Sequence, residues 1–350
     1  MRYRAKIAVL FGGCSPEYSV SLRSAQAVLE HIDSQKYEVV MIGISQAGDW
    51  FRYTGPVERI GADQWHSSRD CAPAVMSVSR SDPSLLVFRG EGLQRIHLDA
   101  AFPVLHGRNG EDGTVQGLFT LAGVPLVGCG VLASALCMDK DRAHKLVQAA
   151  GIEVPASTVL TEETSAEEAL AAAERLGYPL FVKPVRAGSS YGITKVQAGD
   201  ELSAALRLAF TYDDRVIVEE AVSGVEIGCA ILGGEELIVG EPDEVALAGG
   251  FFNFTEKYTL KTAALHVPAR ITAAQRRQVR ESAQTIYRAL DCQGFARVDQ
   301  FLTPAGRLIF NEVNTVPGFT VNSRYPNMMK AVGISFSQMI STLIELAVGR

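Results

Sequence analysis

The sequence lacks long hydrophobic runs and any excess of positive charge. None of its 350 residues lies in a run of about 18 consecutive apolar residues, the length needed to span a membrane. The apolar run at residues 7–11 is too short for the core of a signal peptide, and glycines follow it at once. The formal net charge is −6 at pH 7, whereas binding to nucleic acid or to an anionic membrane needs a basic face. We therefore expect a cytoplasmic protein that has neither a membrane nor a nucleic acid as a partner.

The cysteines are not arranged for a metal site or a disulfide framework. No C-x-x-C pair occurs, and secreted disulfide scaffolds are shorter chains that are denser in cysteine. The six cysteines are scattered along the chain: Cys14, Cys71, Cys129, Cys137, Cys229 and Cys292. We interpret them as reduced thiols of a cytoplasmic protein.

Two common nucleotide-binding fingerprints are also missing. No G-x-x-x-x-G-K-[ST] segment occurs, which excludes a Walker-type NTPase. Gly12 and Gly13 do not form G-x-G-x-x-G, which weakens a dinucleotide-binding interpretation of the first strand and helix. An NAD-type oxidoreductase is therefore kept only as an alternative function, from a different class of enzyme.

The pattern of apolar residues predicts an α/β protein. Continuous apolar runs at residues 6–11, 37–45 and 98–107 are typical of parallel strands buried on both faces, and residues 19–32 between the first two predict a helix. Such a doubly wound sheet binds ligands beyond the carboxyl ends of its strands. Further along, a capping box at Ser165 and Glu168 predicts a helix that ends at Gly177. Strands at residues 179–184 and 193–197 predict a hairpin, and residues 272–290 predict another amphipathic helix.

Polar residues on a second predicted hairpin, residues 295–302 and 307–314, indicate a binding site. Residues two apart in a strand share a face, so Arg297 lies beside Asp299, and Glu312 beside Asn314. Both strands are otherwise apolar, and buried charge is costly unless it is paired or bound to a metal. One interpretation is Mg²⁺ held by these oxygen ligands next to a phosphate. The alternative is a structural ion pair of Arg297 with one of the acids.

Two other segments carry candidate functional groups. Lys183 ends a strand just before a Gly/Ser loop at residues 188–190, where a lysine and backbone N–H groups can hold phosphates; the alternative is an ordinary turn. His106 is expected at a strand end near Glu111, and its alternative is a structural role. The long aromatic loop at residues 249–262 predicts a closing lid, or else a loop packed on the core.

Taken together, these motifs resemble the D-alanine–D-alanine ligases, a branch of the ATP-grasp enzymes. The matching segments, in order along the chain, are GGCSPEYSVS, LHGRNGEDGT, SALCMDKDRAHK, LFVKPVRAGSSYGITKV, VIVEE, EKY, RVD and NEVNTVPGFT. The resemblance implies an ATP-grasp fold with a Rossmann-like N-terminal lobe at residues 1–137. The ATP-grasp domain then covers residues 138–350, with a central lobe at 138–215 and a C-terminal lobe at 216–350.

The resemblance also implies roles for individual residues. The residues matched to ATP are Lys140, Lys183, Ser190, Glu219, Glu226 and Lys257. The residues matched to two Mg²⁺ (or Mn²⁺) ions are Asp299, Glu312 and Asn314. The residues matched to catalysis are Glu17, Ser189, Tyr258, Arg297 and Gly318. The residues matched to the amino acid substrates are His106, Asp243, Phe252, Ser323 and Arg324.

The implied reaction joins D-alanine to a second D-amino acid for peptidoglycan. ATP phosphorylates the first D-alanine, the amine of the second amino acid attacks the acyl phosphate, and ADP and phosphate leave. Tyr258 is the residue expected where the acceptor is an amine, which disfavours D-lactate. Arg324, with Asp243 and Phe252, is similar to the D-alanine–D-serine ligases of vancomycin resistance, so D-alanine and D-serine both stay open as acceptors. The resemblance to this family also implies that the protein is a homodimer.

Overall fold

A computed structural model describes residues 4–67, 69–188, 190–247 and 263–349. Its first part is a seven-stranded sheet of order β6-β5-β4-β3-β2-β1-β7. Its elements are β1 (Ala5–Gly12), α1 (Tyr18–His31), β2 (Tyr37–Ile44), β3 (Trp50–Tyr53), α2 (Glu58–Gly61), β4 (Cys71–Met76), β5 (Ser84–Arg89), β6 (Gly92–His97), β7 (Ala100–Pro103) and α3 (Thr114–Ala122). β1 pairs in parallel with both β2 and β7, as its continuous apolar sequence predicts.

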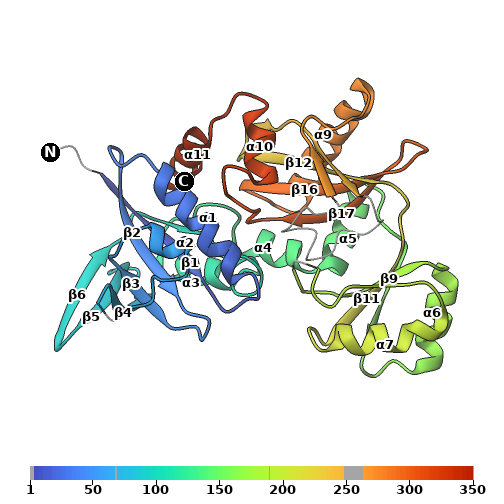
Figure 1. Cartoon of the computed structure of the whole chain (residues 1–350), viewed down its shortest axis with the longest axis horizontal. Helices are drawn as coiled ribbons and strands as arrows, with labels where there is room; N and C mark the ends of the chain where they lie inside the picture. The colour runs from blue at the N-terminus through green and yellow to red at the C-terminus, as the bar shows by residue number, and fades with distance from the viewer. Residues whose placement is uncertain (1–3, 68, 189, 248–262, 350) are drawn as a thin grey trace.

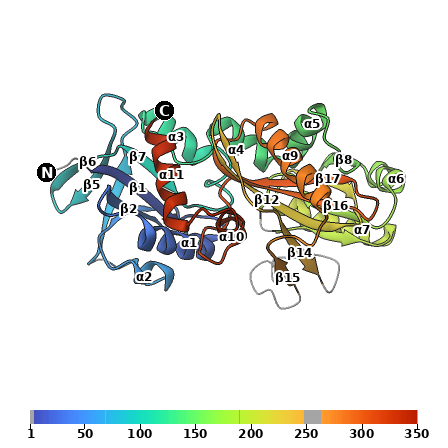
Figure 2. The same ribbon diagram turned by 90° about the horizontal axis from the view of Figure 1, so that it is seen from above.

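The last helix of the chain completes this first part. Helix α11 (Phe336–Val348) buries Met339, Ile340 and Leu343 in the same core as Ile7 and Val9 of β1. It packs beside α1, and Figures 1 and 2 show the C-terminus close to the first sheet. The two ends of the sequence therefore share one core.

The second part is a four-stranded sheet of order β10-β9-β11-β8. Its elements are β8 (Ser157–Thr161), α6 (Ala166–Leu176), β9 (Leu180–Pro184), β10 (Thr194–Val196), α7 (Gly199–Phe210) and β11 (Arg215–Glu220). The capping box of Ser165 and Glu168 at α6 and the antiparallel hairpin of β9 and β10 are both confirmed. Helices α6 and α7 bury their alanine- and leucine-rich faces against this sheet. The lobe boundary expected at residues 215 and 216 falls at the start of β11.

The third part is a larger sheet of order β15-β14-β12-β16-β17, with β13 paired to β12. Its elements are β12 (Val225–Gly233), β13 (Leu237–Val239), β14 (Asp243–Leu247), β15 (Ala263–His266), α9 (Ala273–Ala289), β16 (Gly294–Leu302), β17 (Leu308–Asn314) and α10 (Arg324–Lys330). Helices α4 (Val131–Met138) and α5 (Lys140–Ala149) also pack here, with α5 burying Ala143 and Val147 against the core of α9 and β17. Figure 1 shows this sheet at the upper right, above the four-stranded sheet at the lower right.

One expectation about the first sheet needs correction. β7 ends at Pro103 rather than at His106, and the chain then turns at Gly107, whose φ is +69° and whose carbonyl accepts from the backbone N–H groups of Gly110 and Glu111. His106 therefore lies in a loop beyond the strand. Beside β7, Leu126 forms an isolated parallel bridge with Ala101. No helix among the described residues combines the length and apolar character that a membrane crossing needs.

Candidate active site

A cavity of about 350 Å³ lies between the four-stranded sheet and the larger sheet. Residues from both sheets and from α5 line it, including Lys140, Lys183, Ser190, Glu219, Glu226 and Glu312. All five described residues that the resemblance matched to ATP thus border one cavity. Apolar side chains such as Phe181 and Val245 supply the rest of its wall, which suits a flat aromatic base with a charged tail.

The two described lysines of this cavity are held by different partners. Lys183 on β9 forms an ion pair with Glu219 on the adjacent strand β11, with Nζ 2.9 Å from Oε1. The Lys140 ammonium donates to the carbonyl of Ala187 over 2.7 Å, at the start of the Gly/Ser loop. Two lysines from separate elements therefore line the same cavity, as binding of a polyphosphate requires.

A second cavity of about 290 Å³ lies between α1, the loop after β7 and the segment after β17. Its wall includes the expected substrate and catalytic residues Glu17, His106, Arg297, Gly318, Ser323 and Arg324. Asn314 at the end of β17 also lines it, whereas Glu312, two residues earlier, lines the first cavity. The polar hairpin therefore stands between the two cavities.

The hairpin contains the ion pair that was one of the two interpretations of the sequence. Arg297 donates from Nε and Nη2 to Asp299 over 2.7–2.9 Å, so the predicted ion pair exists. Asp299 and Glu312 are also cross-strand neighbours, and the Asn314 amide lies 3.0 Å from Asp299 Oδ2 and 3.4 Å from Glu312 Oε1. Burial lowers the pKa of Arg297, but the charge of Asp299 outweighs it and the net shift is upward.

The oxygen atoms of this hairpin suit Mg²⁺. The carboxylates of Asp299 and Glu312 are cross-strand neighbours, Glu312 borders the first cavity, and the Asn314 side chain contacts both acids through its amide nitrogen. Hard oxygen donors such as these carboxylates are what Mg²⁺ prefers. Within the described part of the chain there is no group of three or more His, Cys, Asp or Glu side chains that could hold a metal. A cation at the hairpin therefore needs Asn314 and phosphate oxygens to complete its shell, as Mg²⁺ bound to a nucleotide usually does.

Glu17 reaches the second cavity from the residue just before α1. Ser15 fixes this turn, since its hydroxyl donates to the carbonyl of His106 over 2.6 Å and accepts from the backbone N–H of Glu17. A Cβ atom on Gly107 would lie 2.3 Å from Glu17 Oε2. Only glycine at this position leaves room for the carboxylate. The positive φ of Gly107 is a second reason why this position favours glycine.

His106 is both part of the cavity wall and a structural link. Its Nδ1 lies 2.8 Å from the carbonyl of Val316, which only accepts, so Nδ1 carries the proton. Its Nε2 then accepts from Ser24, whose hydroxyl in turn accepts from the backbone N–H of Phe319. Burial lowers the pKa of His106 to about 4, against the raising effect of the Val316 carbonyl, so the ring is neutral at pH 7. These bonds place the loop that contains Gly318.

Glu111 completes this link, and sequence reasoning gave it no role. Its two carboxyl oxygens accept from the backbone N–H groups of Gly107 and Val316 over 2.8 and 2.9 Å. Burial raises its pKa to about 8, with a further contribution from the nearby charge of Glu17. The only signal in the sequence was its place in the segment after His106.

Arg324 is the most heavily paired of the expected substrate residues. It begins α10 and donates from Nε and Nη2 to Asp243 over 2.7 and 2.8 Å and from Nη1 to Glu226 over 2.8 Å. Its Nη2 also lies 3.4 Å from Asp299. A Cβ on Gly228 would lie 2.5 Å from both Arg324 Nη2 and Asp243 Oδ1, so this strand position must lack a side chain. Glu226 thus touches both cavities: it lines the first and holds a residue of the second.

Four expected site residues lie outside the described residues: Ser189, Phe252, Lys257 and Tyr258. The loop at residues 249–262, expected to act as a lid, also lies outside them. All other expected site residues border one of the two cavities or contact a residue that does.

Comparison with known proteins gives the family. Profiles described as the N-terminus and the C-terminus of D-ala D-ala ligase match residues 6–129 and 146–345. The vancomycin C-type resistance protein VanC1 of Enterococcus gallinarum is 46% identical over 347 residues, covering 98% of each chain. The D-alanine--D-alanine ligase of Caldicellulosiruptor bescii is 41% identical over 99% of this chain and 95% of its own.

Solved structures agree with this result. The VanG D-Ala:D-Ser ligase from Enterococcus faecalis superposes with a TM-score of 0.92 and 54% identity, covering 99% of this chain and 100% of its own. The oxidoreductase alternative has no support from any of these similarities. The chain belongs to the D-alanine–D-alanine ligase family and is an ATP-dependent ligase of the ATP-grasp fold that forms D-alanyl dipeptides for peptidoglycan.

Proposed function

We propose that this ligase joins D-alanine to D-serine, with ATP between the two facing sheets and both amino acids in the second cavity. The observation that carries the choice of D-serine is Arg324, which lines the second cavity next to Ser323 while Asp243 and Glu226 hold its guanidinium in place. A guanidinium has five N–H donors. Asp243 and Glu226 accept from three of them and Asp299 lies 3.4 Å from Nη2, so one N–H of Nη1 remains for a hydroxyl. The similarity to the VanG D-Ala:D-Ser ligase supports the same choice.

The proposed roles in the first half of the reaction follow from charge. Lys140 and Lys183 neutralise the phosphates of ATP, and Glu219 and Glu226 lie along the same cavity for the base and sugar. Lys257 and Ser190 are proposed to bind ATP as well. Glu17 accepts from the ammonium of the first D-alanine, beside His106. The carboxylate of that D-alanine attacks the γ-phosphorus and becomes an acyl phosphate, and ADP is released.

Asp299, Glu312 and Asn314 are proposed to hold two Mg²⁺ or Mn²⁺ ions on the phosphates. When bound, these cations supply positive charge that neutralises the transferred phosphoryl group. In the second half of the reaction, the free amine of the acceptor attacks the acyl carbonyl. Arg297 and the Gly318 N–H stabilise the tetrahedral oxyanion, and phosphate then leaves. Ser189 and Tyr258 are proposed to act with Glu17, and Phe252 with Arg324 and Asp243.

The acceptor is tested by a competition experiment. The purified protein is incubated with ATP, Mg²⁺ and D-alanine, with and without excess D-serine, and the dipeptide is identified by mass. We expect mainly D-alanyl-D-serine when both are present. D-alanyl-D-alanine as the sole product under both conditions would overturn the proposal and indicate a housekeeping enzyme.

Three expectations about organisation stay proposals. The division into lobes at residues 1–137, 138–215 and 216–350, the homodimer and the cytoplasmic location rest on family resemblance and composition. Sedimentation of the full chain measures the oligomeric state directly, and a monomer at all concentrations would contradict the homodimer.

A further inference from the structure

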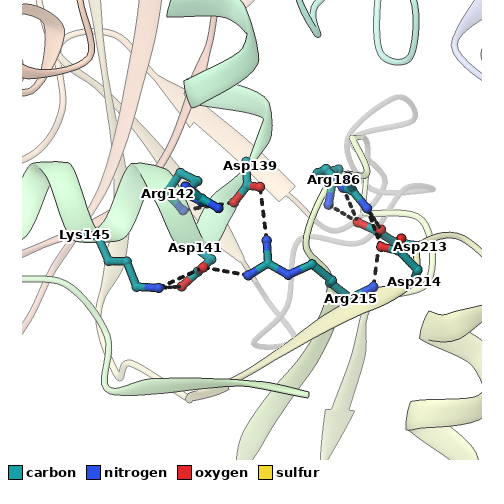
Figure 3. Close-up of polar contacts among 8 residues, drawn as sticks. All are labelled: Asp139, Asp141, Arg142, Lys145, Arg186, Asp213, Asp214 and Arg215. Carbon is teal, nitrogen blue, oxygen red and sulfur yellow. Dashed lines mark hydrogen bonds and ion pairs between the residues drawn. The ribbon is translucent and has the colours of Figure 1, made fainter. Parts of the chain in front are cut away.

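A group of ion pairs lies outside both cavities, where β11 meets the start of α5 (Figure 3). Arg215 at the first position of β11 donates from Nη2 to Asp141 over 2.8 Å, and its Nη1 lies 3.4 Å from Asp139. Asp139 is the N-cap of α5 and accepts from the backbone N–H of Arg142. We refer to Arg215, Asp139 and Asp141 as the Arg215 cluster.

The Arg215 cluster joins two bodies that have separate hydrophobic cores. β11 contributes Val216 and Val218 to the core of the four-stranded sheet. α5 contributes Ala143 and Val147 to the core of the larger sheet. The ion pairs therefore connect the two bodies that form the walls of the nucleotide cavity.

Lys140 lies between the two acids of the cluster in the sequence. Its backbone N–H donates to the carbonyl of Val185 over 3.2 Å, and its ammonium donates to that of Ala187 over 2.7 Å. It reaches the cavity from α5, whereas Lys183 reaches the same cavity from β9 of the other body. The spacing of the two ammonium groups therefore depends on how the bodies are joined.

A second set of contacts fixes the chain next to Lys140. Arg186 donates from its backbone N–H to Asp213 over 2.7 Å, and its side chain pairs with Asp213 and Asp214. The backbone N–H of Val185 donates to the carbonyl of Arg215 over 3.0 Å. Residues 185–187, against which Lys140 rests, are thus bonded to β11 at its beginning.

The two cations that form ion pairs with Asp141 come from different parts of the molecule. Burial raises the pKa of Asp141, but its bonds to Lys145 and Arg215 outweigh burial and lower the pKa, so the carboxylate stays charged. Lys145 binds this carboxylate from within α5, and its side chain is 69% exposed. Arg215 binds it from the other body and is only 28% exposed. Water therefore screens the Arg215 contact less than an ordinary surface pair.

We propose that Arg215 is a positioning residue for the nucleotide phosphates. Through Asp139 and Asp141 it fixes the start of α5, and with it Lys140, at a set distance from Lys183. Arg215 does not line the nucleotide cavity and acts through Lys140. This inference rests on the ATP-binding roles proposed above for the two lysines.

The test compares Arg215→Met with Lys145→Met, which removes the other cation of Asp141 without touching the contact between the bodies. For Arg215→Met we expect the KM for ATP to rise about tenfold, with kcat and the KM for D-alanine within about twofold of the wild type. Lys145→Met is expected to leave all three constants unchanged. Asp141→Asn, which keeps the side-chain size, is expected to follow Arg215→Met and provides the measurement if that variant does not fold.

The variant Lys140→Met distinguishes a failure of the proposed ATP-binding role of Lys140 from a failure of the positioning role of Arg215. A normal KM for ATP in Lys140→Met would contradict the proposed role of Lys140 itself. A raised KM in Lys140→Met with a normal KM in both Arg215→Met and Asp141→Asn would overturn the positioning role alone. Equal increases in the KM for ATP and for D-alanine, or a fall in kcat alone, would indicate a general structural effect and also overturn it. Calorimetric binding of ADP with Mg²⁺ is expected to weaken by the same factor as the KM rises.

Discussion

At the scale of single residues, the site depends on buried charges that are placed by several partners each. Arg297 and Arg324 both contact Asp299, whose side chain is 1% exposed. Removing this carboxylate would take the ion pair from the buried Arg297 and one of three acids from Arg324, so any loss of activity would be mixed with unfolding. The metal hypothesis is better tested at Glu312, whose removal leaves these pairs in place.

Glu312→Gln is expected to lower turnover by about 100-fold or more, because a neutral amide is a poor ligand for Mg²⁺. Phosphate release from ATP with D-alanine measures the effect. Glu153→Gln, at an exposed pair with Arg307, is the matched control and is expected to keep wild-type turnover. Wild-type turnover in Glu312→Gln would remove this residue from the proposed metal site.

Arg324→Leu is expected to shift acceptor preference from D-serine toward D-alanine. The buried Asp243 loses its counter-charge in this variant, which is expected to cost about 3 kcal/mol of unfolding free energy. The ratio of kcat/KM for D-serine to that for D-alanine is therefore the quantity to measure, since it does not depend on the fraction of folded enzyme. An unchanged ratio would show that Arg324 has only a structural role.

At the scale of elements, the turn after β7 shapes the pocket for the first D-alanine. Gly107 combines a φ of +69° with a close approach to the Glu17 carboxylate. Its neighbours His106 and Glu111 bond this turn to the backbone of Val316, in the segment that leads to Gly318. The turn therefore places groups on both sides of the second cavity.

Gly107→Ala is expected to raise the KM for D-alanine at least about tenfold, because the added Cβ displaces the Glu17 carboxylate. Gly177→Ala is the control: Gly177 also has a positive φ, of +82°, but nothing lies within 4 Å of its would-be Cβ. Both variants are expected to lose about 1 kcal/mol of stability from backbone strain. If the KM for D-alanine were equal in the two variants, the contact with Glu17 would not matter for binding.

At the scale of the whole molecule, the C-terminal helix couples the last part of the chain to the first sheet. α11 packs against α1 and β7, and the segment before it carries Gly318 and Arg324. Leu343 is buried in the core that includes Ile7 and Phe11.

Leu343→Ala is expected to lower the unfolding free energy by about 3 kcal/mol, the usual cost of a large-to-small change in a packed core. Thermal or denaturant unfolding measures it. The KM for ATP is expected to stay normal, because the nucleotide cavity is formed by the other two sheets. A rise in that KM without loss of stability would contradict this division of the molecule.

The sequence alone determined most elements and the polar hairpin. The period of two in β16 and β17 placed Arg297 beside Asp299 and Glu312 beside Asn314. The capping box predicted α6, and the amphipathic pattern predicted α9. These features depend on neighbours a few residues apart, which a sequence shows directly. Even so, the sequence could not choose between an ion pair and a metal site, and the structure contains the ion pair next to oxygen atoms suited to a cation.

Only the tertiary structure decided which distant charges meet. Arg324 meets Asp243 and Glu226 across 81 and 98 residues of chain, Arg215 meets Asp141 across 74, and Glu111 bonds to Val316 across 205. No periodicity or motif encodes such pairs, because their distance depends on how three sheets pack together. The partners that hold Lys140, Arg324 and the Gly318 loop in place follow from that packing, since the free energy of burying each charge depends on what the fold puts beside it.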